Sequence, residues 1–186
     1  MDESLAQKII KTRIVSIYWL PGEWKTFFAS FISYFYDRVY SNVDFYQNWK
    51  KKNITINTMI DIETKIKFSN QVWVLILDEA WANLNSRESM TEKNKIFWRL
   101  AMLSRKYNIN IVVISQLERM QDVYYREMSF FHFEMHSYFT GPNYLLFDMM
   151  IKDRFWNIIA NKTLDLIKFS NMFKYTYNTL DKSLID

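Results

Sequence analysis

Trp19 to Thr26 read Trp-Leu-Pro-Gly-Glu-Trp-Lys-Thr, and the interpretation of the whole chain starts from this stretch. Lys25 and Thr26 supply the ending of the Walker A pattern G-x-x-x-x-G-K-S/T, a loop whose main-chain N–H groups surround phosphate oxygens. The two glycine positions of that pattern fall on Trp19 and Trp24, while Gly22 fits the common variant Gly-Leu-Pro-Gly-Ser-Gly-Lys-Thr. Glycine lets the loop approach the phosphates closely, so a tryptophan beside the lysine should clash there. By itself the stretch is either an altered phosphate-binding loop or a chance Lys-Thr pair at a helix start.

A short apolar run further along the chain ends in two acids. Val72 to Leu77 read Val-Trp-Val-Leu-Ile-Leu, and Asp78 and Glu79 follow directly. Such a run suits a strand buried on both faces, as in a parallel sheet, and ligands bind at the carboxyl ends of such strands. This is the Walker B arrangement, in which Asp78 would hold Mg²⁺ and Glu79 would polarise the attacking water. The alternative is a core strand that ends in two solvated acids.

A third segment fits the same plan. Asn110 to Ser115 read Asn-Ile-Val-Val-Ile-Ser, a second buried-strand pattern, and Gln116 follows it. In P-loop ATPases with a catalytic glutamate, an extra strand lies between the Walker A and Walker B strands, and a polar residue at its end faces the γ-phosphate. Gln116 is placed for that role, or it is a turn residue that ends a strand. Arg126 is a candidate arginine finger for a neighbouring subunit's site, or a surface arginine.

Together these motifs resemble the FtsK–HerA superfamily of ATPases, and above all its small viral members. Those are genome-packaging ATPases and the zonula-occludens-toxin-like assembly proteins of filamentous phages. The shared order is Walker A, Asp-Glu, a helix ending Leu-Ser-Arg-Lys-Tyr, a strand ending in Gln and a downstream Arg, over about residues 11 to 130. These proteins also tend to carry an asparagine after the second strand, which Asn42 matches.

The resemblance implies a RecA-like α/β fold, with a mostly parallel sheet flanked by helices and the sensor strand between the Walker A and Walker B strands. It implies a homo-oligomeric ring that moves double-stranded DNA without sequence preference, using ATP and Mg²⁺, with a portal, capsid or membrane partner. Thr26 and Asp78 would hold the metal, and Glu79, Gln116 and Arg126 would serve hydrolysis. The nucleotide would be bound by the loop residues Pro21, Gly22, Glu23, Trp24, Lys25 and Thr26.

Composition is compatible with this interpretation. The chain of 186 residues is 49% hydrophobic and 24% charged, which suits one domain with an ample core. Cysteine is absent, and neither a signal peptide nor an apolar run long enough to span a membrane is visible, so we expect a cytoplasmic or virion-associated protein. The net charge of +4 permits contact with DNA phosphates. The basic run Lys50 to Lys52 is a solvated turn or a DNA contact.

Glycine is scarce and tryptophan abundant. The chain has 2 glycines and 7 tryptophans, whereas average usage predicts roughly 13 glycines in a chain of this length. Trp19 and Trp24 stand at motif glycines, and Trp49 stands in an evident turn. Some genetic systems read the codon UGA as glycine and others as tryptophan, so one hypothesis is that these tryptophans are recoded glycines. An AT-rich gene or a degenerated site are the alternatives.

The remaining pattern predicts alternating strands and helices in a single domain over residues 1–186, with about 130–186 extending the sheet or contacting a neighbouring subunit. Helices are expected at Thr26 to Tyr36 and Thr91 to Tyr107, and strands at Arg13 to Trp19, Val39 to Phe45 and Phe130 to Phe139. Asn53 to Lys67 and Leu145 to Met150 can be read as helix or strand. His132, Glu134 and His136 would share one strand face, as a metal site or as a polar solvent face.

Three classes of function are compatible with these residues. The first is an ATP-driven DNA motor that packages a viral genome. The second is a phage assembly or secretion ATPase that acts at a membrane. The third is a P-loop protein that has lost ATP binding and serves a structural role. Retention of Lys25, Asp78, Glu79 and Gln116 argues against the third.

Overall fold

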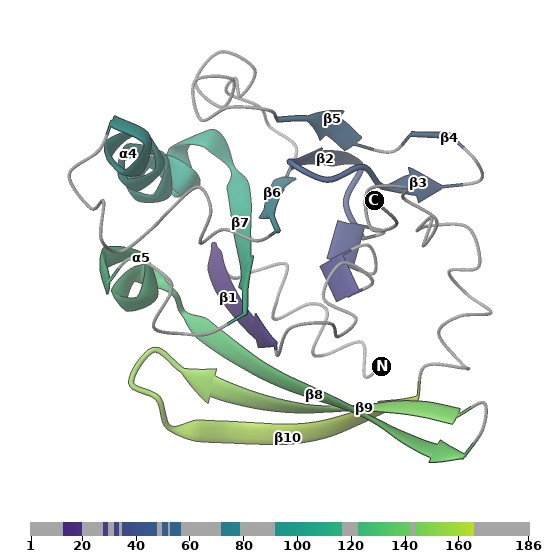
Figure 1. Ribbon diagram of the computed structural model, residues 1–186. Coiled ribbons are helices and arrows are strands. Elements are labelled where there is room, and N and C mark those ends of the chain that lie inside the picture. Colours follow the sequence, from purple (N-terminus) through teal and green to yellow (C-terminus); the bar gives the residue numbers. More distant parts are fainter. Residues whose placement is uncertain are drawn as a thin grey trace.

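The computed structural model describes residues 13–19, 28–29, 32–33, 35–47, 50–51, 53–56, 72–78, 92–116, 123–141 and 144–165 (Figure 1). In chain order its strands and helices are β1 (Ile14–Trp19), β2 (Arg38–Ser41), β3 (Tyr46–Gln47), β4 (Lys50–Lys51), β5 (Asn53–Thr55), β6 (Trp73–Leu77), α4 (Glu92–Tyr107), β7 (Ile109–Ser115), α5 (Val123–Met128), β8 (Phe131–Gly141), β9 (Tyr144–Asp153) and β10 (Ile158–Asp165).

The main sheet has eight strands in the order β10-β9-β8-β1-β7-β6-β2-β5. All neighbours from β8 to β5 run parallel, and β7 pairs with β1 on one side and with β6 on the other. All seven residues of β7 and all five of β6 are buried, as expected of apolar strands covered on both faces. The predicted RecA-like arrangement, with a strand between the Walker A and Walker B strands, is confirmed.

Two hydrophobic cores cover the two faces of this sheet. One contains Phe28, Ala29 and Ile32, which are helical residues between β1 and β2, together with strand residues such as Val112 and Ile114. The other is built on α4, whose Phe97, Leu100 and Ala101 pack on Ile111 and Val113 among others. Figure 1 shows α4 and α5 on the same side of the sheet. Alternate residues of β7 therefore supply both cores, since neighbouring side chains of a strand point to opposite faces.

The C-terminal part of the sheet is antiparallel. β8 pairs with β9 and β9 with β10 in antiparallel register, and the three strands form a long ribbon along one side of the molecule in Figure 1. Residues 145–150, which the sequence left open between helix and strand, lie within β9. The sheet is thus mixed, with its parallel part carrying the predicted motifs.

Element bounds differ from prediction in several places: Phe35 and Tyr36 lie outside the helix expected over residues 26–36, and β8 runs to Gly141 where the predicted strand ended at Phe139. The strand expected over residues 39–45 ends at Ser41, because residues 42–45 turn and are held by side chains described below. Lys50 and Lys51, expected in a turn, form β4, which pairs with β3 in a small two-stranded sheet. Lys52 lies outside the described residues, and so do residues 57–71 of the segment that the sequence left open.

Candidate nucleotide site

The carboxyl ends of the central parallel strands bring two of the predicted site residues, Asp78 and Gln116, to one edge of the sheet. In the ladder between β1 and β7, Tyr18 lies opposite Ser115, so Gln116 follows β7 where β1 also ends. In the ladder between β6 and β7, Leu77 lies opposite Val113, and Asp78 follows β6 directly. The loop predicted to bind phosphate leaves β1 at this same edge. Asp78 and Gln116 therefore end strands on the same side of the sheet as that loop.

Asp78 is buried, with 3% of its surface exposed, and its main chain is held by Asn42. The Asn42 Nδ2 group donates to the Asp78 carbonyl oxygen, and the Asp78 N–H donates to Asn42 Oδ1, each at 2.8 Å. Asn42 thus continues the pairing of β2 with β6 through its side-chain amide, since it follows the last paired residue Ser41 and bonds to Asp78, two residues past Ile76. This fixes the position from which the acid, and Glu79 after it, leave the strand.

The turn that carries Asn42 is itself held by side chains. The Val43 N–H donates to Ser41 Oγ at 3.1 Å. Asn53, at the start of β5, accepts from the Phe45 N–H at 2.7 Å and donates to the Val43 carbonyl at 2.9 Å. Asn53 is 6% exposed and was not singled out from the sequence. Its only sequence signal is a polar residue opening an apolar segment, which also fits an ordinary turn.

The helical segment after the predicted loop is tied to the strand between the two motifs. The Asn110 Nδ2 group of β7 donates to the Tyr36 hydroxyl at 2.8 Å, inside the protein. Burial raises the pKa of Tyr36 to about 12, although the hydrogen bond from Asn110 acts to lower it. Tyr36 is therefore neutral and anchored. The hydrogen bond links the segment that follows the loop to the centre of the sheet.

Several predicted site residues lie outside the described residues. These are all of the predicted nucleotide-binding loop and the predicted catalytic acid, namely Pro21, Gly22, Glu23, Trp24, Lys25, Thr26 and Glu79. Their roles stay predictions. The described strands give only the points from which these segments leave the sheet, at the end of β1 and directly after Asp78.

Arg126 lies apart from this edge. It belongs to α5, five residues before β8 begins at Phe131, and β8 runs parallel to β1 with Phe131 opposite Val15. It is thus nearer the amino end of β1 than the carboxyl end where Asp78 and Gln116 lie. The described geometry does not bring Arg126 to its own subunit's site, and a role at a neighbour's site stays a prediction.

The described residues could hold a magnesium ion only together with other ligands, such as the phosphates of a bound nucleotide. Mg²⁺ in nucleotide sites is held by one or two protein carboxylates together with substrate phosphates. Asp78 supplies one such carboxylate at the correct edge. Within the described part of the chain, no group of three His, Asp or Glu residues could hold a metal ion by itself. Asp78, with Thr26 as the predicted second ligand, would hold the ion, which would neutralise phosphate charge during hydrolysis.

The alternative metal site on β8 is not formed. His132 is fully buried and stacked under Trp156, with ring centroids 4.0 Å apart, whereas His136 is exposed. Glu134 accepts a hydrogen bond from Lys152 Nζ at 2.7 Å and lies 3.4 Å from His136. The lysine ammonium holds the pKa of Glu134 below its usual value. Glu134 and His136 belong to a polar surface, and His132 belongs to an aromatic cluster.

Comparison with known proteins identifies the fold. No protein-family description matches the chain, and no curated protein sequence matches it. Among solved structures, the chain is similar to the N-terminal domain of zonular occludens toxin from Neisseria meningitidis. The TM-score is 0.51 at 17% identity, over 93% of this chain and 96% of that one.

Two further structures give the same result. The genome packaging NTPase B204 from Sulfolobus turreted icosahedral virus 2, solved in complex with ATP-gammaS, has a TM-score of 0.52 at 10% identity, over 83% of this chain and 96% of that one. A KaiC-like protein from Pyrococcus horikoshii has a TM-score of 0.53 at 11% identity, over 82% and 84% of the two chains. At such identities the likeness establishes the fold.

A membrane-spanning helix is not found in the described part of the chain, where no helix is both long and apolar enough. The strand order, the buried acid after β6 and the structural likenesses all lead to the same conclusion. This chain has the α/β fold of RecA-like P-loop ATPases, and it resembles the viral genome-packaging members among them.

Proposed function

We propose that this protein is an ATP-driven motor that translocates double-stranded DNA into a viral capsid. The observation that carries the proposal is the placement of β7 between β1 and β6. This order sets Asp78, Gln116 and the end of β1 at Trp19 on one edge of the sheet, where ligands bind in open α/β folds. The packaging NTPase with which the chain shares its fold supports the DNA role.

In the proposed reaction each residue has a role that follows from its chemistry. Lys25 would neutralise the β- and γ-phosphates, and Glu79 would accept a proton from the attacking water. Gln116 would orient that water from the end of β7. The two hydrogen bonds from Asn42 would keep Asp78 in place while phosphate charge changes. Mg²⁺ would supply charge stabilisation at the phosphates.

A second candidate function is a phage assembly or secretion ATPase. Its support is the likeness to the zonular occludens toxin domain, which spans 93% of this chain. The two functions share nucleotide chemistry and differ in the load. A DNA motor hydrolyses ATP faster when duplex DNA is added, whereas a secretion ATPase need not respond to DNA.

The decisive experiment addresses the loop, because Trp19 and Trp24 replace the glycines of the Walker A pattern. The unaltered chain should bind ATP weakly, because a non-glycine before the lysine is strained and its indole crowds the phosphates. Trp19→Gly with Trp24→Gly should restore binding of Mg²⁺-ATP, with Trp24 contributing more. Adding Lys25→Ala should abolish it again. Calorimetric titration of ATP into the three proteins measures this.

The outcomes separate the three classes of function. Binding and DNA-stimulated hydrolysis by the double variant support the motor. Binding and hydrolysis that duplex DNA leaves unchanged favour the assembly ATPase. Absence of ATP binding after both substitutions favours a structural P-loop protein, and tight binding by the unaltered chain would show that the loop has been misread.

A further inference from the structure

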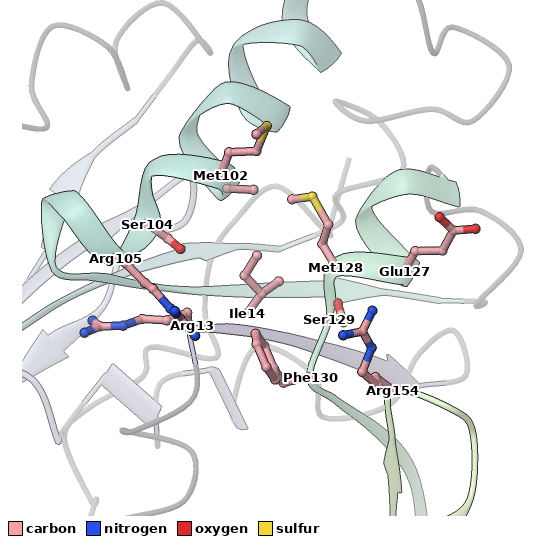
Figure 2. Close-up of a pocket in the computed structure, with 11 residues that line it drawn as sticks. Arg13, Ile14, Met102, Ser104, Arg105, Glu127, Met128, Ser129, Phe130 and Arg154 are labelled. Atoms are coloured by element: carbon pink, nitrogen blue, oxygen red, sulfur yellow. The ribbon is translucent and has the colours of Figure 1, made fainter.

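A pocket of about 270 Å³ opens at the edge of the sheet opposite Asp78 and Gln116 (Figure 2). It is lined at the amino end of β1, at the last turns of α4 and α5, and at the turn between β9 and β10. Its position separates it from the candidate nucleotide site. The described residues that line it are Arg13, Ile14, Ala101, Met102, Ser104, Arg105, Glu127, Met128, Ser129, Phe130 and Arg154.

Three arginines from distant segments gather around this pocket. Arg13 precedes β1, Arg105 lies in the last turn of α4, and Arg154 lies in the β9–β10 turn. Glu127 is the one acid among the described lining residues, so the lining carries net positive charge. Figure 2 shows Arg13 and Arg105 on one side of Ile14 and Arg154 on the other, so their side chains border the opening from both sides.

The pocket is partly preorganised. Arg13 Nη1 donates to Asn108 Oδ1 at 2.9 Å, which holds the guanidinium beside the end of α4. A guanidinium has five N–H donors, so this bond leaves others for a ligand. Apolar side chains such as Ile14 and Phe130 form part of the wall, and a low-polarity wall strengthens the attraction between arginines and an anion.

We propose that this pocket binds a backbone phosphate of duplex DNA. An arginine guanidinium can donate two parallel hydrogen bonds to two oxygens of one phosphate. Phosphate contacts also dominate the non-specific affinity of proteins for DNA. The inference rests on the proposed DNA motor, since a motor without sequence preference must hold the DNA backbone. It adds the residues that would do so and places them on the edge away from ATP.

The test is titration of a fluorescein-labelled DNA duplex of mixed sequence with the unaltered chain, without nucleotide, at several salt concentrations. Arg105→Gln with Arg154→Gln should weaken binding at least tenfold at low salt. It should also reduce the slope of log affinity against log salt by up to about 0.9 for each phosphate that the variant no longer neutralises. The matched control is Arg99→Gln with Lys162→Gln, which removes the same charge from exposed positions outside the pocket.

The outcomes are distinct from those of the nucleotide experiment. If the pocket variant behaves as the control does, or if the chain binds poly-glutamate but not DNA, the pocket proposal is overturned while ATP hydrolysis can still hold. Arg105→Lys with Arg154→Lys guards against misfolding, because it keeps the charge and removes the fork. The proposal predicts affinity between that of the unaltered chain and that of the glutamine variant, with an unchanged melting temperature.

A separate observation concerns Trp156, whose φ of 67° lies in the left-handed region. Its N–H donates to the Asp153 carbonyl at 3.0 Å, and the Asp153 N–H donates to the Asn157 carbonyl at 3.0 Å. Asp153 Oδ1 also accepts from the N–H groups of Phe155 and Asn157. This is a hairpin turn in which Trp156, two residues before β10 begins, is left-handed, a position where glycine is the default.

Asn108 and Trp73 differ from Trp156 in ways that show why a tryptophan is unusual at position 156. The only other described non-glycine residue with positive φ is Asn108, after α4, and asparagine tolerates this conformation. Trp73 differs, since it lies in β6, is 2% exposed and packs against Tyr40 with ring centroids 5.4 Å apart. Trp73 is packed like a core tryptophan, whereas Trp156 has a main-chain conformation that is typical of glycine.

From this we infer that the natural protein carries glycine at positions 19, 24 and 156. The Walker A pattern requires it at the first two, and the backbone requires it at the third, for unrelated physical reasons. The scarcity of glycine, 2 against 7 tryptophans, fits the same origin in a UGA codon translated as tryptophan. The inference at position 156 does not depend on the nucleotide site, whereas the inference at positions 19 and 24 rests on a loop that binds nucleotide.

The gene sequence provides the first test. UGA at codons 19, 24 and 156 is expected, and UGG at all three would overturn the inference. A second test compares Trp156→Gly with Trp156→Ala in chemical unfolding. Both remove the stacking on His132, and only glycine relieves the left-handed strain, so the glycine variant should have a folding equilibrium constant about fivefold larger or more. Equal stabilities would remove the backbone argument. Trp73→Gly, the matched control, should be strongly destabilising.

Discussion

The side-chain amide of Asn42 forms two hydrogen bonds with the main chain of Asp78, each 2.8 Å long. These two hydrogen bonds join the end of β2 to the end of β6, next to which lies Asp78, the buried acid of the predicted metal site. An amide that both donates to and accepts from the main chain of one residue fixes its position and its orientation. Asn42 is therefore the described residue that most directly sets the geometry of the candidate site.

Removing the Asn42 side-chain amide should lower the stability of the protein and leave Asp78 less firmly positioned. Asn42→Ala leaves the Asp78 N–H and carbonyl without these partners, so the free energy of unfolding should fall by about 2 kcal/mol. Urea unfolding measures this, with Asn161→Ala, at an exposed position of β10, as the control expected within about 0.5 kcal/mol of the unaltered chain. Equal losses in the two variants would show that the bonds contribute nothing.

The predicted catalytic role of Glu79 can be tested in the chain with glycines restored at positions 19 and 24. Glu79→Gln removes the carboxylate that would accept the water proton, so hydrolysis should fall on the order of 10²-fold or more while ATP binding is retained. Steady-state phosphate release and calorimetry measure the two properties. Hydrolysis at the unaltered rate would exclude Glu79 as the base.

The predicted role of Arg126 at a neighbouring subunit's site can be tested with assemblies that combine two kinds of subunit. In the chain with glycine at positions 19 and 24, if Arg126 reaches a neighbour's γ-phosphate, subunits with Arg126→Ala and subunits with Glu79→Gln should each be inactive alone. Mixed, they should regain part of the hydrolysis, because some interfaces combine an intact acid with an intact arginine. Strictly monomeric behaviour in the presence of ATP and DNA would contradict both the finger and the ring.

His132 predicts a specific loss of stability in acid. Burial lowers its pKa from 6.5 to about 4, helped by the charges of Lys152 and Arg126 and opposed by Asp153. Between these values the unfolded chain binds a proton that the folded chain excludes. The free energy of unfolding should therefore fall as pH drops from 6.5 towards 4, by at most about 1.4 kcal/mol per unit, with no contribution from His132 above that window.

The measurement compares urea unfolding across this pH range for three proteins. His132→Phe should flatten the decline, because the ring stays and the titrating group is gone. His136→Gln, at an exposed position of the same strand, should leave the decline unchanged. The lowered pKa values of Glu134 and Asp153 have Lys152 and Asn157 as their main causes, so most of their contribution to acid sensitivity is common to all three proteins. Parallel curves for all three would contradict the prediction.

The parallel part of the fold was predictable because its signals are local. Continuous apolar runs such as Val72 to Leu77 mark strands buried on both faces, and the regular apolar face of residues 91–107 marks the helix that became α4. The position of β7 followed from the resemblance, which supplied a strand order that periodicity alone does not contain. Asp78 and Gln116 could be placed because polar residues at strand ends are visible in a sequence.

The other features depend on interactions between distant segments. Nothing in the sequence near Asn53 indicates that its amide closes the turn of residues 43–45, because that turn exists only once β2 and β5 pair. The three arginines of the pocket come from positions 13, 105 and 154, and only the fold brings them together. From its alternation with Glu134, His132 could be read as a metal ligand or as part of a polar solvent face, and the alternation does not reveal that Trp156 covers it.

The left-handed backbone at Trp156 also bears on how the protein can be made in the laboratory. If its codon and those of Trp19 and Trp24 are UGA, a common expression host stops translation before the first strand is complete and yields no protein. A host that inserts tryptophan at UGA yields a chain with an obstructed loop and a strained hairpin, and its inactivity would be misread as loss of function. Purification should therefore begin from a synthetic gene with glycine codons at these three positions.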